Sequence, residues 1–104
     1  MDYSELNDTN FEEFIKETQG GLLLFYKKLC PHCLNMKKVI EKVANTQGLD
    51  TSIMFIDSEQ NSKSMGILNV ELVPTILIIK QGKVKTKKTG LMNPRELTAL
   101  YKNA

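Results

Sequence analysis

The chain has few side chains that can act as a soft metal ligand or that titrate near neutral pH. Its 104 residues include two Cys, one His and three Pro, and it has no Trp. Two cysteines are too few for a disulfide scaffold, and one histidine does not complete the four ligands of a self-contained zinc site. No apolar run approaches the roughly 18 residues of a membrane span. We therefore predict neither a metal site nor a membrane partner.

The totals otherwise fit one ordinary domain. With 41% hydrophobic residues, 104 residues can bury a core of their own, so we predict a single domain over residues 1–104. The first ten residues, MDYSELNDTN, are acidic and polar, unlike a secretory signal. This favours a cytoplasmic location. A periplasmic chain whose signal had been removed and replaced by Met would look the same.

The densest run of charge of one sign is KQGKVKTKK, residues 80–88. A nucleic-acid surface would interleave aromatic side chains for base stacking, and this run has none. We interpret the run as a solvated hairpin whose lysines protect the edge of a sheet. No nucleic-acid partner is predicted.

The apolar pattern predicts strands that alternate with helices. Continuous apolar runs of strand length, fit for burial on both faces, lie at 22–26, 52–56 and 75–79. A tight turn at Gln81–Gly82 leads into a polar-faced strand over 83–89, and residues 2–6 are a possible first strand. Together these segments predict an α/β fold with a mixed sheet of four to five strands, covered by helices on both faces.

Four helices are predicted between and after these strands. The first spans 8–21, with Thr9 as N-cap, Glu12 completing a capping box, and Phe11, Phe14 and Ile15 on its apolar face before the Gly20–Gly21 stop. The second spans 31–46, with Leu34 starting its apolar face and Gly48 following. Residues 61–68 are a short, weaker helix or a turn region. The last begins at Asn93, with Pro94 and Glu96 in its first turn.

The reactive chemistry concentrates in FYKKLCPHC, residues 25–33, where a strand meets a helix. In open α/β sheets, active sites gather at this carboxyl end of a strand. Pro31 suits the first helical turn, so Cys30 should sit at the helix tip, where free amides and the helix dipole stabilise a thiolate. Cys33 lies one turn further, close enough for a disulfide. The spacing therefore predicts thiol–disulfide exchange, with one cysteine attacking and the other resolving.

His32, between the cysteines, can donate a hydrogen bond or a positive charge to the Cys30 thiolate and so lower its pKa. Lys27 and Lys28 add a weaker, solvent-screened field. The alternatives are plain: the cysteines could be buried hydrophobes, and His32 a surface residue. Likewise Pro74 could be an ordinary proline at a strand start.

Taken together, FYKKLCPHC after a buried strand, FID ending the next strand, VPTILIIKQGKV and Thr89–Gly90 resemble the thioredoxin family over nearly the whole chain. The resemblance implies a three-layer α/β/α fold, Cys30 as nucleophile and Cys33 as buried resolving thiol. It implies that Pro74 is a cis-proline facing the disulfide. It also implies that Val73 pairs its backbone with an extended substrate, and that Leu29, Gly90 and Met92 complete the substrate-binding surface.

Three departures from this family stand out. The dipeptide Pro31–His32 resembles the C-P-H-C site of the periplasmic DsbA oxidants, without the helical insertion of that class. The family's buried aspartate corresponds to Leu24, and its partner lysine to Ile53. Without that carboxylate a charge that raises thiol pKa is gone, so we expect a pair more oxidising than that of an ordinary thioredoxin. The glutathione signature of glutaredoxins is missing after the Pro74 strand.

The resemblance implies protein thiols and disulfides as substrates, a thioredoxin-reductase-type electron donor, a monomer, and no cofactor beyond the Cys30–Cys33 pair. The alternative is a binding module. Two chains could pool their cysteines around one soft metal ion, or the fold could serve as a redox-silent adaptor.

Overall fold

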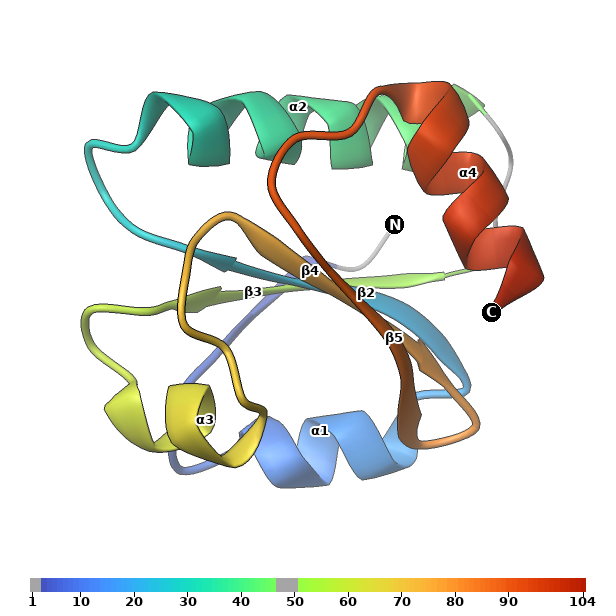
Figure 1. Cartoon of the computed structure of the whole chain (residues 1–104). Helices are drawn as coiled ribbons and strands as arrows, with labels where there is room; N and C mark the ends of the chain where they lie inside the picture. Colours follow the sequence, from blue (N-terminus) through green and yellow to red (C-terminus); the bar gives the residue numbers. More distant parts are fainter. Residues whose placement is uncertain (1–2, 47–50) are drawn as a thin grey trace.

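A five-stranded mixed sheet runs through the middle of the molecule, in a computed structural model that describes residues 3–46 and 51–104 (Figure 1). The strand order is β1-β3-β2-β4-β5. β3 pairs in parallel with β1 and β2, whereas β4 is antiparallel to both β2 and β5. The strands are β1 (Tyr3–Leu6), β2 (Gly20–Tyr26), β3 (Ser52–Asp57), β4 (Thr75–Lys80) and β5 (Lys83–Thr89).

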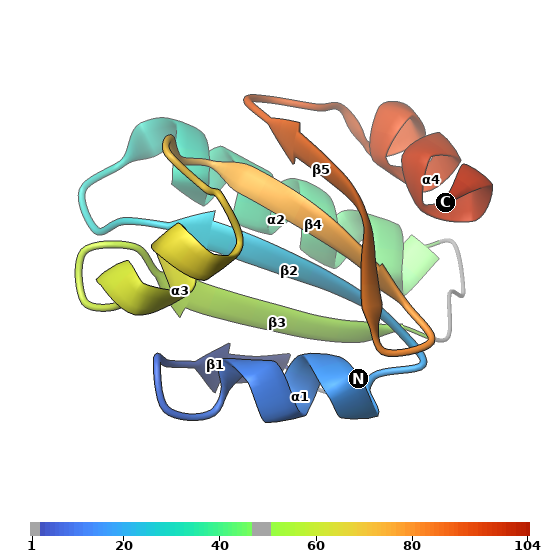
Figure 2. The same cartoon turned by 60° about the horizontal axis from the view of Figure 1, so that its bottom comes forward.

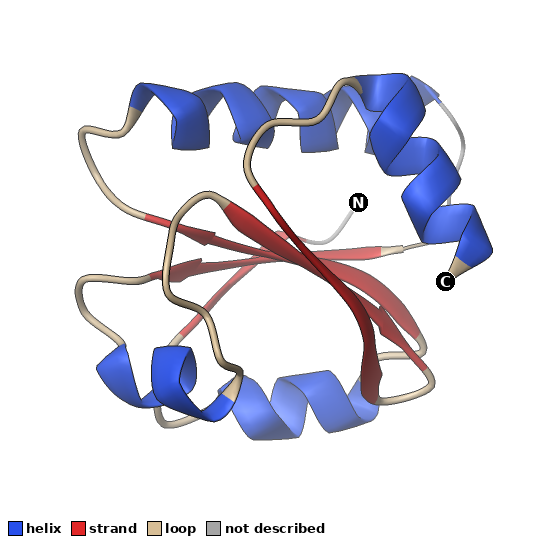
Figure 3. Cartoon of the chain, in the orientation of Figure 1, coloured by secondary structure: helices blue, strands red, loops and turns tan. Residues whose placement is uncertain are grey.

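Helices cover both faces of this sheet (Figure 3). The helices are α1 (Phe11–Glu17), α2 (Pro31–Thr46), α3 (Ser62–Ile67) and α4 (Pro94–Asn103). α2 and α4 lie on one face, and α1 and α3 on the other (Figures 1 and 3). The predicted three-layer α/β/α architecture is confirmed. In the described ranges no helix is both long enough and apolar enough to cross a bilayer.

The central strand β2 shows why its sequence is continuously apolar. Successive side chains point to opposite faces of a sheet. Leu22 and Leu24 pack in the core on the side of α2 and α4, while Leu23 and Phe25 pack in a second core on the side of α1 and α3. All four are fully buried. A strand covered on both faces therefore needs no polar alternation.

The start of the first helix differs from the prediction. Thr9 does not cap it: the Asn7 side chain instead accepts the backbone N–H groups of Thr9 (2.8 Å) and Asn10 (3.0 Å). The helix begins at Phe11, and its predicted core residue Phe14 is 40% exposed. The local Asx turn wins because a short polar side chain satisfies nearby amides without helical backbone.

The end of the first helix also differs from the prediction. The two glycines predicted to stop the first helix open β2 instead, because the helix already ends at Glu17. The predicted stop at Gly48 lies outside the described residues. The hairpin turn at Gln81–Gly82 is confirmed: both residues have positive φ, and a Cβ on Gly82 would lie 2.6 Å from the Lys16 carbonyl oxygen. Only glycine therefore fits this turn against the end of α1.

Two connections meet at the end of the sheet where β2 and β3 finish. The segment joining β2 to α2 and the segment joining α3 to β4 lie side by side at this end in two views (Figures 1 and 2). The first carries the cysteine motif and the second carries Val73 and Pro74. The topology therefore joins the two motifs that are 40 residues apart in the sequence.

Candidate active site

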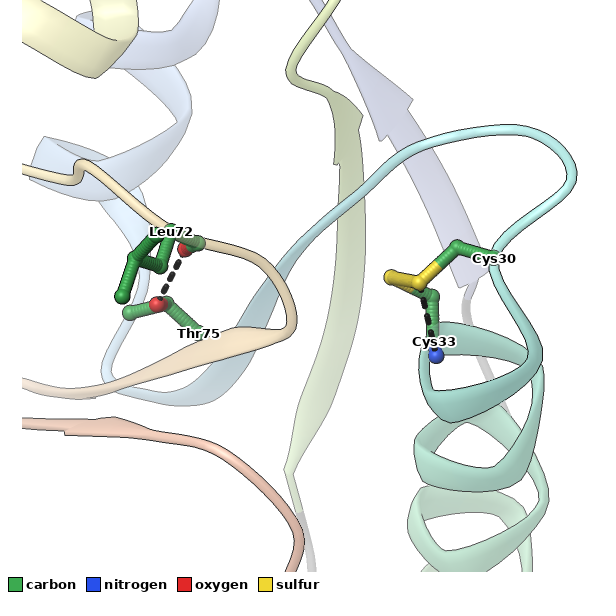
Figure 4. Close-up of a disulfide and its surroundings, with 4 residues drawn as sticks. All are labelled: Cys30, Cys33, Leu72 and Thr75. Atoms are coloured by element: carbon green, nitrogen blue, oxygen red, sulfur yellow. Dashed lines mark hydrogen bonds between the residues drawn. A yellow bond between two sulfur atoms is a disulfide. The ribbon is translucent and has the colours of Figure 1, made fainter.

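Cys30 and Cys33 form a disulfide at the junction of β2 and α2, with Cα atoms 5.2 Å apart (Figure 4). The two cysteines differ in access. Cys30 is partly exposed, whereas Cys33 is only 1% exposed, inside the first turn of the helix. A substrate can therefore reach the sulfur of Cys30 more readily than that of Cys33.

The start of α2 holds the Cys30 sulfur close to backbone donors. The Cys33 N–H donates to Cys30 Sγ at 3.2 Å, and the Leu34 N–H donates to the Cys30 carbonyl at 3.0 Å. No acidic residue lies in the first turn. A thiolate at Cys30 would accept the same amide and face the positive end of the helix dipole, which lowers the pKa of a thiol.

The flanking residues project outward. Leu29 has a positive φ of 56° and is fully exposed, because the chain turns sharply there between β2 and α2. Pro31 and His32 are exposed. Within the described residues, the His32 side chain makes no hydrogen bond in this disulfide form. Its predicted partner, the thiolate, does not exist here, so its tuning role stays a prediction.

The segment before β4 carries the second predicted part of the site, Val73 and Pro74. The Val73–Pro74 peptide bond is cis, as the resemblance implied. Pro74 is buried and Val73 partly buried. The Pro74 carbonyl accepts the Gly90 N–H at 2.9 Å, and the Thr75 hydroxyl donates to the Leu72 carbonyl at 2.6 Å (Figure 4). The structure thus joins Gly90 to the Pro74 segment. That Pro74 faces the disulfide stays a prediction.

The core on the α2 side of the sheet is apolar. Leu24 and Ile53, the positions that the resemblance assigns to the family's charged pair, are both fully buried in it. Met92 belongs to the same core. It is 6% exposed, and its N–H points to the Met36 sulfur at 3.3 Å. The structure therefore places this predicted substrate contact among core residues, and its contact with substrate stays a prediction.

Several leucines are exposed that the sequence did not indicate as surface residues. Leu34 was predicted on the buried face of α2, but it is 57% exposed, and Leu72 and Leu91 are also exposed. Leu34 comes four residues after Cys30, hence on the same side of the helix, a spacing that could have signalled its position. With Leu29, Leu34 gives the surface beside Cys30 an apolar rim.

A groove of about 630 Å³ opens beside the disulfide, at the β2–α2 connection. Burial, and next the hydrogen bond from its hydroxyl to Glu5 Oε2 (2.8 Å), raise the pKa of Tyr26 well above its ordinary value. The phenol therefore stays neutral. The lining residues are Tyr26, Lys27, Lys28, Leu29, Cys30, Pro31, Cys33, Leu34 and Lys37.

Metal chemistry finds no support in the part of the chain that the structure describes. There, no three His, Cys, Asp or Glu side chains come together as a possible metal site. The two cysteines bond to each other instead. The geometry of this site is that of a dithiol–disulfide pair.

Comparison with known proteins agrees with this geometry. Residues 2–103 match the family model described as Thioredoxin. The chain is 30% identical over 98 residues to "Thioredoxin 2" of Chlorobaculum tepidum, covering 93% of this chain and 89% of that protein. It is 32% identical over 95 residues to "Thioredoxin" of Listeria monocytogenes, covering 89% of each.

A solved structure has the same fold. The solution structure of reduced desulfothioredoxin from Desulfovibrio vulgaris Hildenborough superposes with a TM-score of 0.85 at 35% sequence identity. The match covers 98% of this chain and 97% of that one. Sequence and fold therefore point to the same family.

Proposed function

The chain belongs to the thioredoxin family and is a thiol–disulfide oxidoreductase, and from this premise we propose that Cys30 is its attacking thiol and Cys33 its resolving thiol. The carrying observation is the asymmetry of the pair. Cys30 is partly exposed and its sulfur accepts an amide of α2, whereas Cys33 is buried. A stabilised, accessible thiolate is the better nucleophile.

In the reducing direction, the Cys30–Cys33 dithiol reduces a substrate disulfide in two steps. The Cys30 thiolate attacks one sulfur of the substrate disulfide, forming a mixed disulfide and releasing the other sulfur as a thiolate. The Cys33 thiol loses its proton and attacks Cys30 Sγ, which breaks the mixed disulfide. The substrate leaves as a dithiol. The enzyme has given it two electrons and is left oxidised, with a Cys30–Cys33 disulfide. The oxidising direction is the reverse.

We propose that the reduction potential of the Cys30–Cys33 pair is higher, and the pair therefore more oxidising, than that of an ordinary thioredoxin. Supporting this, the first turn of α2 has no acidic residue, His32 stands beside Cys30, and Leu24 replaces a buried carboxylate. Each feature stabilises the thiolate, and hence the reduced form. Equilibration with glutathione tests this: we expect a potential above about −270 mV, toward the about −120 mV of DsbA-type oxidants.

Protein thiols and disulfides are the substrates of the family, and the surface formed by the segment before β4 is proposed to hold them. Val73 would pair its backbone with an extended substrate segment, beside Pro74, with Leu29, Gly90 and Met92 around it. The chain would work as a cytoplasmic monomer, without a cofactor beyond its cysteine pair. A thioredoxin-reductase-type enzyme would supply the electrons.

A trapping experiment tests the roles of the two cysteines. With Cys33→Ser, a mixed disulfide between Cys30 and a protein substrate should accumulate and be visible on a non-reducing gel. Faster alkylation of Cys33 than of Cys30 at pH 6 in the reduced protein would reverse the assignment. Stoichiometric metal and metal-dependent dimerisation, with no disulfide exchange, would replace it with the metal-module alternative.

A further inference from the structure

The charged side chains that line the groove beside Cys30 all have the same sign. They are Lys27, Lys28 and Lys37, and the remaining lining residues are apolar, aromatic or the two cysteines. The whole stretch from residue 27 to residue 38 contains four lysines and no acidic residue. Any substrate segment entering this groove therefore meets several positive side chains and no negative one along its lining, next to the reacting sulfur.

Lys37 is held in place by aromatic rings. Its Nζ lies 3.7 Å from the centroid of the Tyr26 ring and 5.0 Å from that of Phe55. Such cation–π contacts leave the other side of the ammonium group available to an anion. The nearby Glu5 carboxylate accepts the Tyr26 hydroxyl, so its hydrogen bonding is directed to the phenol.

Lys27 and Lys28 lie on the other rim of the groove, in the exposed β2–α2 connection. Among the residues that the structure describes, neither takes part in an ion pair or a side-chain hydrogen bond. Within the described residues, Lys27 and Lys28 thus present cations without an ion-pair partner, and Lys37 presents one held by aromatic rings. The groove is also lined by the apolar residues Leu29, Pro31 and Leu34.

We propose that this groove selects protein segments in which acidic residues flank the disulfide cysteine. This inference rests on the proposed function, because it assumes that Cys30 attacks the bound disulfide. Carboxylates would pair with the lysines on the rims, while the cysteine and its apolar neighbours lie over Pro31 and Leu34. A volume of about 630 Å³ holds a short stretch of side chains.

The test compares two disulfide-linked peptides that are identical except that Glu or Gln flanks each cysteine. At low ionic strength we expect kcat/KM to be about tenfold higher for the Glu peptide, since two or three exposed ion pairs are each worth up to about fivefold. The preference should shrink toward one as salt rises to about 1 M, where the Debye length falls to about 3 Å.

Matched variants locate the effect. The triple variant Lys27→Gln, Lys28→Gln, Lys37→Gln should bring the ratio between the peptides close to one. A control triple, Lys83→Gln, Lys85→Gln, Lys88→Gln, removes the same net charge from the edge strand β5 and should keep the wild-type ratio. Lys37→Arg keeps the cation over the rings and should also keep the ratio.

Each outcome decides. If wild type exchanges both peptides at equal rates, the inference is overturned and the proposed function stands. If the control triple lowers the ratio as much as the groove triple, net charge rather than the groove sets the preference, and the inference fails. If wild type exchanges neither peptide nor any protein disulfide, the proposed function itself fails. The salt series on wild type needs no variant, so misfolding of the triple would not remove the test.

Discussion

Two helices of this protein have a proline in their first turn, but one helix start serves reactivity and the other serves stability. Pro31 opens α2 behind Cys30, and Pro94 opens α4 behind Asn93. At α4, the Asn93 side chain accepts the Glu96 N–H at 2.8 Å, and the Glu96 carboxylate accepts the Asn93 N–H at 3.2 Å. This capping box satisfies two free amides and compensates the helix dipole.

At α2 the corresponding place is taken by sulfur. The Cys33 N–H points to Cys30 Sγ, and the first turn has no carboxylate. The positive end of the dipole is thus left for the negative charge that develops on Cys30. The comparison teaches that a helix start with proline in its first turn supports stability where Asn93 and Glu96 form a capping box, and reactivity where a cysteine sulfur takes that place.

Removing either sulfur should give the largest effect. Cys30→Ser should reduce disulfide exchange to the background rate, because a hydroxyl at this helix start does not ionise as a thiol does. Cys33→Ser should retain the attack and stop at the mixed disulfide. Turnover assays together with mass spectrometry of trapped adducts distinguish the two. Full activity in Cys30→Ser would contradict the assignment.

Leu24→Asp would place beneath α2 the carboxylate that its start lacks. Leu24 is fully buried, and Ile53 offers the new charge no partner. We expect a loss of about 3 kcal/mol or more in the free energy of unfolding. We also expect a higher thiol pKa and a faster resolving step, because the carboxylate can take the Cys33 proton.

Denaturant unfolding and thiol titration measure both effects of this change. Leu23→Asp is the matched control, because Leu23 is equally buried but packs in the core on the opposite face of the sheet. It should lose stability without moving the thiol pKa. A folded Leu24→Asp protein with an unchanged thiol titration would show that this position does not act on the pair.

His32→Gly should shift the reduction potential of the Cys30–Cys33 pair without a large change in the free energy of unfolding. Losing a donor to the Cys30 thiolate should raise the pKa of Cys30 and lower the reduction potential by roughly 20–40 mV, equivalent to about 1–2 kcal/mol. His32→Lys should keep part of the effect, and Lys27→Ala should change little. Titration against glutathione measures this. An unmoved pKa and potential would mean that α2 alone tunes the pair.

Asn93→Ala, at the stabilising helix start, should have the smallest effect. Loss of the cap should cost about 1 kcal/mol of stability. The potential of the Cys30–Cys33 pair should not move, because Asn93 caps a helix that does not carry the cysteines. Thermal melts and the glutathione titration check the two halves. A shifted potential would show that the two helix starts are coupled.

Much of the fold and part of the candidate site could be predicted from residues close together in the chain. The apolar runs at 22–26, 52–56 and 75–79 became buried strands, and the Asn93–Glu96 capping box formed as predicted. Cys30 and Cys33 met in a disulfide, since a one-turn spacing brings them together whatever surrounds the helix. These features depend on local periodicity and on hydrogen bonds between neighbours in sequence.

The tertiary structure decided the rest, because burial depends on what packs against an element. It left Leu34 and Phe14 exposed although helical spacing put both on apolar faces. It joined Pro74 to Gly90 and placed Met92 in the core. It also set Lys37 over the Tyr26 ring beside the disulfide, which no spacing along the chain could indicate. Such contacts form only when segments far apart in sequence share one surface.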